Sequence, residues 1–247
     1  MNIEVVTLFP EMIQEAMRHG VVGRAVTRGV LAVGTENPRT HTSDLHQSVD
    51  DRPYGGGPGM VMKPEPLAAA IAAAMERLPV GSLRVAMSPQ GQLLNGALLN
   101  RLRAAPGLVL VAGRYEGIDE RVLTTSIDME LSIGDFVVSG GELPALVVID
   151  ALTRLLPGVL GDERSSVEDS FADGILDWPH YTRPEVYAGQ KVPPVLLSGD
   201  HAAIRRWRRK QALGRTWRRR PELLAALPPD AERELLLSEY LQGREDA

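Results

Sequence analysis

LVLVAGRYEG, residues 108–117, is a run of five apolar residues followed by a loop that contains glycine. Such a short continuous apolar run is typical of a strand buried on both faces. Similar runs predict strands at Ile3–Leu8 and Leu83–Met87, and helical patterns follow both of them. This alternation of strands and helices predicts an α/β fold, with a mostly parallel sheet and helices on both of its faces.

The remaining segments complete the expected organisation. Further strands are expected at Val30–Gly34 and Met129–Ile133, and helices at Glu11–His19, Pro64–Leu78, Leu94–Ala104, Leu143–Leu156, Ala202–Leu213, Pro221–Leu227 and Ala231–Leu241. Residues 37–59 are expected to form a long loop, and loops of that length are usually functional or mobile. Frequent glycine and proline after residue 157 predict a first domain over 1–160, a linker over 161–178 and a helical domain over 179–247.

Composition excludes several classes of function. The 247 residues include no cysteine, so disulfides, thiolate metal sites and cysteine nucleophiles are excluded. The five histidines show no metal-ligand spacing, so no metal site is expected. No apolar run approaches the roughly 18 residues of a membrane helix, and we expect a cytoplasmic protein that makes no membrane contact.

The strongest local charge lies near the C-terminus, although the net charge of the chain is −5. Residues 201–221 contain nine basic residues and no acidic one, namely Arg205, Arg206, Arg208, Arg209, Lys210, Arg215, Arg218, Arg219 and Arg220. Cations without local counter-charges repel one another, so a polyanion such as nucleic acid is the expected partner. Alternatively, the arginines cover Trp207 with their stems. Trp207 and Trp217 are expected to anchor the core rather than to stack on bases.

Three expected strands end in unusual loops: MSPQG at 87–91, AGRYEG at 112–117 and SIGDFVVSGGE at 132–142. Ligands of open α/β sheets bind at the carboxyl ends of the strands, so these loops are expected to share one pocket. The alternative is that their glycines only permit tight turns. Rossmann and P-loop motifs are both absent. The glycines at 55–59 suit either a phosphate-binding nest of amides or a flexible turn.

Two charged features remain open at this point. Residues 168–181 hold four carboxylates and His180 in an irregular loop, which suits either an acidic functional loop or a solvated linker. Arg154 lies in an apolar helix, where a charge needs a partner, and Asp150 one turn earlier is a candidate.

Many ordered motifs together resemble one known family, the bacterial tRNA (guanine-N1)-methyltransferases of the SPOUT class, called the TrmD family. The motifs are RPYGGGPGM at 52–60, SPQG at 88–91, GRYEGIDER at 113–121, SIGDFVVSGGELPA at 132–145, PGVLG at 157–161, EDSF at 168–171, PHYTRPE at 179–185, VPPVLLSG at 192–199 and IRRWR at 204–208. The resemblance extends from the first strand to about Leu224 and weakens at 68–83, at 92–106 and after Pro228.

The resemblance implies a fold that physical rules alone would reject, because knots are nearly absent from proteins. It implies a SPOUT-type parallel sheet with a C-terminal trefoil knot, followed by a small helical C-terminal domain. It also implies a homodimer, in which the acidic loop of one subunit completes the active site of the other. The knot loops would bind S-adenosylmethionine through Ser88, Pro89, Gly113, Tyr115, Glu116, Ser132, Ile133, Gly134, Asp135, Phe136, Val137, Val138, Gly140, Gly141 and Pro144.

The implied reaction is methylation of N1 of the guanosine 3′-adjacent to the tRNA anticodon, at position 37. Because N1 carries a proton at neutral pH, the reaction needs a base, and a cation near O6 stabilises the charge that develops there. The resemblance assigns these roles to Asp169 and Arg154. It implies tRNA contacts by Asp50, Arg52, His180, Arg183, Arg205, Arg208 and Arg209, and assistance by Mg²⁺ without a recognisable protein site.

Two other functions compete with this interpretation. A catalytically inert RNA-binding protein would use the basic helix and would not retain S-adenosylmethionine. An enzyme of the same fold that methylates ribose or another base would keep the cofactor. Only the pairing of Asp169 with Arg154 argues against the latter.

Overall fold

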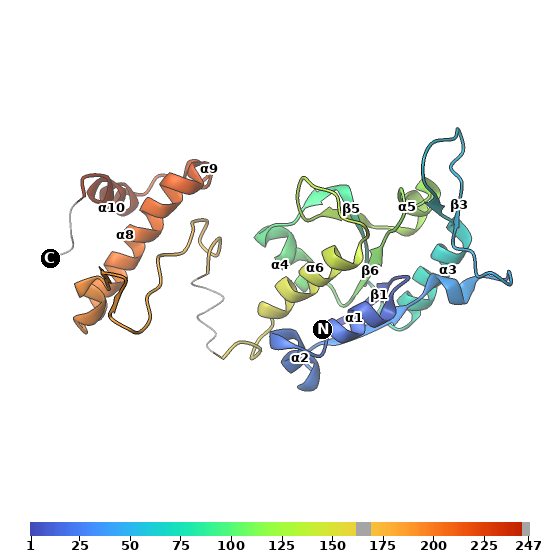
Figure 1. The fold of residues 1–247 in the computed structure, drawn as a ribbon, viewed down its shortest axis with the longest axis horizontal. Helices are drawn as coiled ribbons and strands as arrows, with labels where there is room; N and C mark the ends of the chain where they lie inside the picture. The colour runs from blue at the N-terminus through green and yellow to red at the C-terminus, as the bar shows by residue number, and fades with distance from the viewer. Residues whose placement is uncertain (162–168, 244–247) are drawn as a thin grey trace. The chain divides into compact units, whose positions relative to one another are not determined.

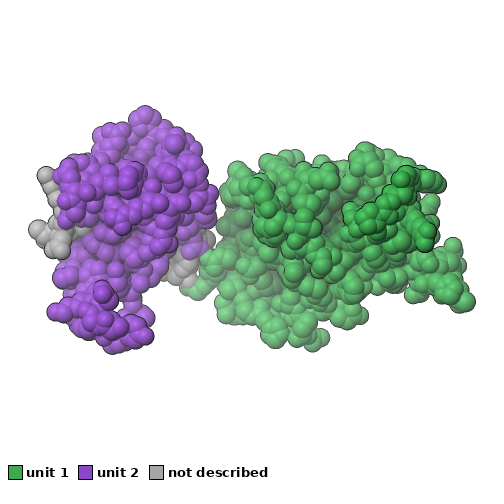
Figure 2. All heavy atoms as spheres, turned by 45° about the horizontal axis from the view of Figure 1, so that its top comes forward, with its two compact units in different colours: residues 1–161 green, residues 162–247 purple. Residues whose placement is uncertain are grey.

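The computed structural model describes residues 1–161 and 169–243, and the chain divides into two compact units. The first unit is Met1–Gly161 and the second is Asp162–Ala247 (Figure 2).

A five-stranded sheet forms the centre of the first unit (Figure 1). Its strands, in spatial order, are β2 (Ala32–Glu36), β1 (Asn2–Val6), β6 (Leu108–Ala112), β5 (Leu83–Leu93) and β7 (Met129–Ser132). Every pairing between neighbouring strands is parallel. The predicted α/β class and parallel sheet are therefore confirmed.

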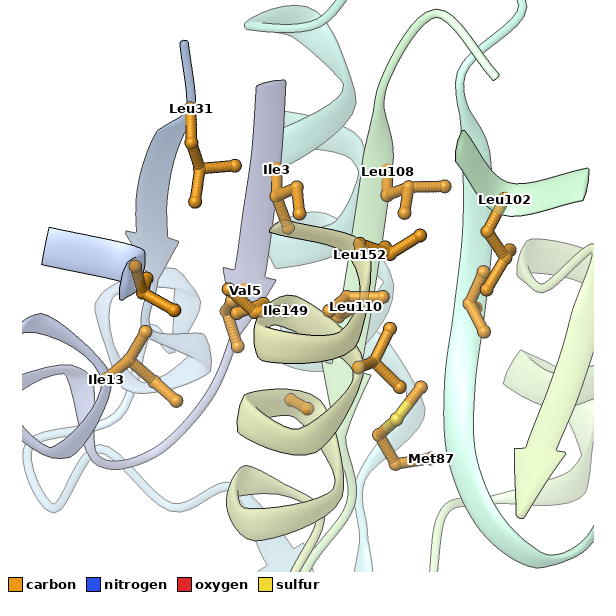
Figure 3. Close-up of a cluster of buried hydrophobic side chains, with 14 of the residues drawn as sticks. Ile3, Val5, Ile13, Leu31, Met87, Leu102, Leu108, Leu110, Ile149 and Leu152 are labelled. Atoms are coloured by element: carbon orange, nitrogen blue, oxygen red, sulfur yellow. The ribbon is translucent and has the colours of Figure 1, made fainter. Parts of the chain in front are cut away.

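Helices cover both faces of the sheet. Successive strand residues point to opposite faces, and in the central strand β6 both sets of side chains are apolar and buried. Ile3, Val5, Leu108 and Leu110 face the first cluster of buried side chains, which also contains Ile149 (Figure 3). The helices of this face are α1 (Pro10–Ala16), α2 (Gly20–Thr27), α4 (Gly96–Arg103) and α6 (Glu142–Arg154). The opposite face packs against α3 (Pro64–Glu76) and α5 (Glu120–Ser126).

Helices α2 and α5 were not predicted from the sequence. The sequence of α2, GVVGRAVT, combines glycine and β-branched residues, which are weak helix formers. Its Val22, Gly23 and Ala25 are nevertheless buried, so tertiary packing stabilises the helix. Helix α5 is capped by Asp119, whose side chain accepts a hydrogen bond from the Arg121 backbone N–H at 2.9 Å.

The long segment 37–59 contains more structure than the predicted loop. It holds a short 3₁₀ helix, η1 (Pro38–His41), and β3 (Asp50–Asp51), which pairs antiparallel with β4 (Val61–Met62). Gly55, Gly56, Gly57 and Gly59 all have positive φ, a conformation that glycine adopts without steric cost.

The second unit is mainly helical within its described residues. It contains β8 (Val186–Tyr187), β9 (Gln190–Lys191), η2 (Pro194–Leu197), α8 (His201–Arg219), α9 (Pro221–Ala225) and α10 (Ala231–Leu241). Its core consists of Ile175, Ala212, Leu213 and Leu236. Residues 169–178 therefore pack with the helical unit through Ile175.

Helix α8 extends past the predicted end at Leu213. Gly214 continues it, and a Cβ there would lie 2.3 Å from the Tyr240 ring, so only glycine allows α8 and α10 to approach so closely. Trp207 is buried, as predicted. The same prediction for Trp217 is wrong, because this side chain is 46% exposed. It lies beyond Thr216, the last buried residue of α8, where the helix no longer packs against the core.

Candidate functional site

The carboxyl ends of β5, β6 and β7 meet at one edge of the parallel sheet, and the loops that follow them enclose a pocket of about 310 Å³. Ser88 and Pro89 lie after the regular part of β5, Gly113 follows β6, and Ile133 follows β7. The expectation that the three loops share one pocket is therefore confirmed.

The pocket lining contains every residue predicted to contact the cofactor except Asp135, which is exposed outside it. It also contains residues that the sequence analysis did not select, namely Ala86, Met87, Gln90, Arg114, Gly117, Ile118, Glu120, Leu123, Glu130, Leu131 and Ser139. Arg114 and Ile118 belong to the same GRYEGI run as the predicted residues, so their position in the sequence could have indicated them. Leu123 could not be found in this way, because α5 itself was not predicted.

Close backbone contact fixes the spacing of the pocket loops. The Gly141 N–H donates a hydrogen bond to the Gly113 carbonyl at 2.8 Å. A Cβ on Gly141 would lie 2.6 Å from the Ala112 Cα, which is too close for any other residue. A Cβ on Gly91 would likewise lie 2.3 Å from the backbone of Leu131. Glycine is therefore needed here for close packing, and not only for a turn.

Tyr115 connects the pocket to the segment before it. Its φ of 62° is in the left-handed region, which is uncommon for a residue other than glycine and is often found at functional sites. Burial, followed by the hydrogen bond and the negative charge of Asp50, raises the pKa of the Tyr115 hydroxyl. This hydrogen bond shows that Asp50, which was predicted to contact RNA, lies beside a residue of the pocket.

The glycine-rich segment 55–59 also reaches the pocket wall. The Glu116 backbone N–H donates to the Met60 carbonyl at 2.9 Å, and a Cβ on Gly59 would lie 2.2 Å from the Glu116 carboxylate. Carboxylates of Glu116, Glu120 and Glu130 line the pocket. This negative charge suits a ligand that carries a positive charge.

A second pocket, of about 200 Å³, lies within the second unit and includes Asp169. Its other lining residues are Asp173, Ile175, Leu176, Asp177, Trp178, Arg205, Arg208, Arg209 and Ala212. The guanidinium of Arg208 lies over the Trp178 ring, 4.9 Å from its centroid, while its Nε is buried without a hydrogen-bond partner. Arg209 forms an ion pair with Asp173, and His180 Nε2 lies within hydrogen-bond distance of Asp177 Oδ2 at 2.7 Å.

These contacts correct one expectation about the basic segment. It was expected to lack local counter-charges, but Arg206 pairs with Glu239 at 2.8 Å, Arg209 with Asp173 and Arg220 with Glu222. Glu239 lies in α10, Glu222 in α9 and Asp173 in the segment before β8, so a count along residues 201–221 misses all three partners. Arg205 remains exposed, and no ion pair of this side chain is found among residues 1–161 and 169–243.

The remaining predicted site residues occur in both units. Arg154 is the last residue of α6 in the first unit, whereas Asp169 belongs to the second unit. Arg52 in the first unit and His180 and Arg183 in the second are exposed. Residues 162–168 of the predicted loop lie outside the described residues.

The described part of the chain contains neither a metal-binding cluster nor a membrane-spanning helix. Among residues 1–161 and 169–243, no group of three or more His, Asp or Glu side chains could hold a metal ion. In the same residues, no helix has the length and apolar character needed to cross a membrane.

Comparison with known proteins gives a consistent result. The family model described as tRNA (Guanine-1)-methyltransferase TrmD matches residues 1–226. A tRNA (guanine-N(1)-)-methyltransferase of Methylococcus capsulatus is 60% identical over 240 residues, which are 97% of this chain and 96% of the relative. Relatives with the same name from Pseudomonas entomophila and Salmonella schwarzengrund are 56% and 57% identical, over 100% and 97% of this chain and 99% and 94% of their own lengths.

Both the family match and these identities extend over nearly the whole chain, including all three pocket loops. A methyltransferase of this family implies S-adenosylmethionine as the methyl donor. The chain belongs to the tRNA (guanine-N1)-methyltransferase family.

Proposed function

We propose that this enzyme transfers the methyl group of S-adenosylmethionine to N1 of the guanosine 3′-adjacent to the tRNA anticodon, at position 37. The observation that carries the proposal is the pocket at the ends of β5, β6 and β7, whose lining includes nearly all of the residues that the family resemblance assigns to the cofactor. In this scheme residues 1–160 bind the cofactor, residues 161–178 form the active-site loop and residues 179–247 bind tRNA.

The pocket fits S-adenosylmethionine in size, shape and charge. Its volume of about 310 Å³ is within the usual range for small-molecule sites. Gly113 in the lining is half-buried and has no side chain, so a ligand can approach its backbone closely. Glu116, Glu120 and Glu130 in the lining make the pocket suitable for the positive charge of a sulfonium group. The bound cofactor supplies an electrophilic methyl group.

The acceptor chemistry is assigned to Asp169 and Arg154. Asp169 accepts the N1 proton of the guanine, and the Arg154 guanidinium stabilises the negative charge that develops at O6. An aspartate is a weak base, with a reference pKa of about 3.9, so the cation at O6 must make the N1 proton more acidic. Asp169 lines a pocket with Trp178 and three arginines, which supports a role next to an anionic aromatic substrate.

The exposed arginines of the second unit are assigned to the tRNA backbone. Arg205 is the clearest candidate, because Arg209 is already paired with Asp173 and Arg208 lies against Trp178. Arg183 and His180 are also exposed, and Asp50 and Arg52 would approach tRNA from the first unit. We also propose that Mg²⁺ assists the reaction without a recognisable protein site. An enzyme that modifies tRNA is expected to act in the cytoplasm.

The proposal includes the trefoil knot of the SPOUT class. Two positions support the knot. Strand β7 lies at the edge of the sheet, whereas the next helix, α6, packs beside β6 and α2, so the chain returns across the sheet between them. The chain between them ends at Gly141, the N-cap of α6, which packs directly against Ala112 of β6. Pulling residues 1–161 from both ends tests the knot: a knotted chain stops short of its full extended length, and an unknotted chain does not.

The proposal also includes a homodimer with composite sites. On α6, Leu143 and Val147 are one helical turn apart and are 49% and 46% exposed. Exposed apolar residues at this spacing form a face that a second subunit would cover.

Gly113→Ala is expected to weaken S-adenosylmethionine binding about tenfold, or about 1.4 kcal/mol, because the methyl group enters the pocket wall. Its Cβ would lie 3.3 Å from the flexible side chain of Ile118, so the fold should tolerate it. Isothermal titration calorimetry measures the affinity. Gly96→Ala, where a Cβ meets nothing within 4 Å, is the control. Equal affinities in the two variants would place the cofactor elsewhere.

Asp169→Asn is expected to lower the rate of methyl transfer about a hundredfold or more, because the amide cannot accept the N1 proton. Cofactor affinity should be unchanged. Asp173→Asn removes a carboxylate from the same pocket and is the matched control. Single-turnover assays with unmodified tRNA measure the rate, and a similar loss in both variants would contradict the specific assignment to Asp169.

Arg205→Gln is expected to raise the KM for tRNA and to reduce the slope of log K against log salt concentration by about one, because one phosphate contact is lost. Arg206→Gln makes the same charge change on the same helix, but Arg206 pairs with Glu239. Its slope should change less. Filter binding at several salt concentrations gives both slopes, and an unchanged slope for Arg205→Gln would refute its phosphate contact.

Mixing an Arg154→Ala protomer with an Asp169→Asn protomer is expected to restore activity, because each heterodimer then has one intact composite site. With equal amounts and free exchange, about half of the dimers are mixed and one site of each is intact, so activity should return to about a quarter of wild type. A mixture that exchanges subunits and stays inactive would show that each subunit has its own complete site.

A further inference from the structure

One guanidinium group connects two walls of the pocket in the first unit. Arg114 Nε donates a hydrogen bond to Glu142 Oε2 at 2.8 Å, and Nη2 lies at the same distance from that oxygen. Arg114 Nη1 also donates to the Ser139 carbonyl at 3.1 Å. Arg114 therefore holds the residues on both sides of the glycine pair 140–141.

The second oxygen of Glu142 extends this connection to β1. Thr7 Oγ1 donates to Glu142 Oε1 at 2.8 Å, and both side chains are fully buried. Thr7 Oγ1 in turn accepts the Phe9 backbone N–H at 2.9 Å. The Phe9 ring covers the guanidinium of Arg114 at 4.5 Å. The network therefore joins the end of β1, the 113–117 loop and the start of α6.

Gly140 shows how tightly Arg114 packs against the opposite loop. A Cβ at Gly140 would lie 2.1 Å from Arg114 Nε, so the arginine occupies the space of a side chain. The backbone hydrogen bond from Gly141 to Gly113 lies beside it. Arg114, Ser139, Gly140 and Gly141 all line the pocket, whereas Glu142 and Thr7 do not. A movement of Arg114 would thus change the pocket lining directly.

We propose that Arg114 is a positioning residue, which acts through Glu142 and the Ser139 carbonyl to hold the 113–117 loop at the spacing from the 136–141 loop that the methyl donor requires. The identity of this donor rests on the proposed function. A site whose walls are held in place before binding loses less conformational entropy when the ligand binds, and it binds more tightly for that reason. The planar, forked guanidinium suits this role, since it reaches two acceptors at once.

The first test needs no ligand. In the free protein, Arg114→Gln should increase amide hydrogen exchange at residues 113–117 and 136–141 by about tenfold or more, because both loops lose their common anchor. The control is Arg121→Gln, since Arg121 is exposed, pairs with Asp119 two positions earlier and does not line the pocket. Its exchange should match wild type at both loops. Unchanged exchange in Arg114→Gln would overturn the proposal, whatever ligand the pocket takes.

The second test separates positioning from stability. Breaking a buried ion pair destabilises the fold, whereas replacing both partners with apolar residues often does not. The double variant Arg114→Met, Glu142→Met should therefore recover the melting temperature of wild type, and its affinity for S-adenosylmethionine should stay about tenfold weaker. Arg114→Lys should fall between wild type and Arg114→Gln. A double variant that recovers both stability and affinity would show that the network is only structural.

Kinetics give a third measurement of the same variants. The KM for S-adenosylmethionine in Arg114→Lys should rise more than kcat falls, and the KM for tRNA should stay at the wild-type value. If the rate of methyl transfer by Arg114→Lys fell by the same factor at all cofactor concentrations, the positioning role would be overturned. If wild-type protein bound no S-adenosylmethionine, the proposed function would fail, and the exchange experiment would still decide whether Arg114 holds the two loops together.

Discussion

Close backbone packing at the carboxyl edge of the sheet is the constraint on which the pocket depends. Gly141 lies directly against Ala112 and donates its N–H to Gly113, and Gly91 lies against Leu131 in the same way. Any Cβ at these two positions would overlap backbone that belongs to the sheet or to its loops. The loops can therefore form one pocket only if glycine occupies both positions, and the Arg114 network then holds the spacing that the glycines allow.

In the proposed function the two units contribute different chemistry to one reaction. The first unit has a pocket whose lining includes Glu116, Glu120 and Glu130, which suits a cationic small molecule. The second has a pocket that combines aspartates, arginines and Trp178, which suits an anionic aromatic substrate. A division of this kind is expected when a small cofactor must react with a large nucleic acid. The fold provides a rigid site for the former and a charged surface for the latter.

The basic segment shows why charge along the sequence is an incomplete guide to binding. Residues 201–221 contain nine cations and no acidic residue, yet Arg206 and Arg209 find carboxylates on other elements. An ion pair of this kind lowers the positive potential that a phosphate would meet. Exposed cations that form no ion pair within residues 1–161 and 169–243, such as Arg205, are better candidates for backbone contact than the total charge suggests.

The sequence by itself determined the α/β class, the parallel sheet and the loops that form the pocket, because these follow from local patterns. Apolar runs mark buried strands, and glycine-rich loops after them mark the ligand edge of the sheet. Only the tertiary structure decided the features that depend on distant residues. Helix α2 forms from weak helix formers because the first unit buries Val22 and Ala25, and Glu142 finds Arg114 and Thr7 across 28 and 135 positions of the chain. No local periodicity records such contacts, since their energy comes from burial and from charge pairing between segments that meet only in the folded chain.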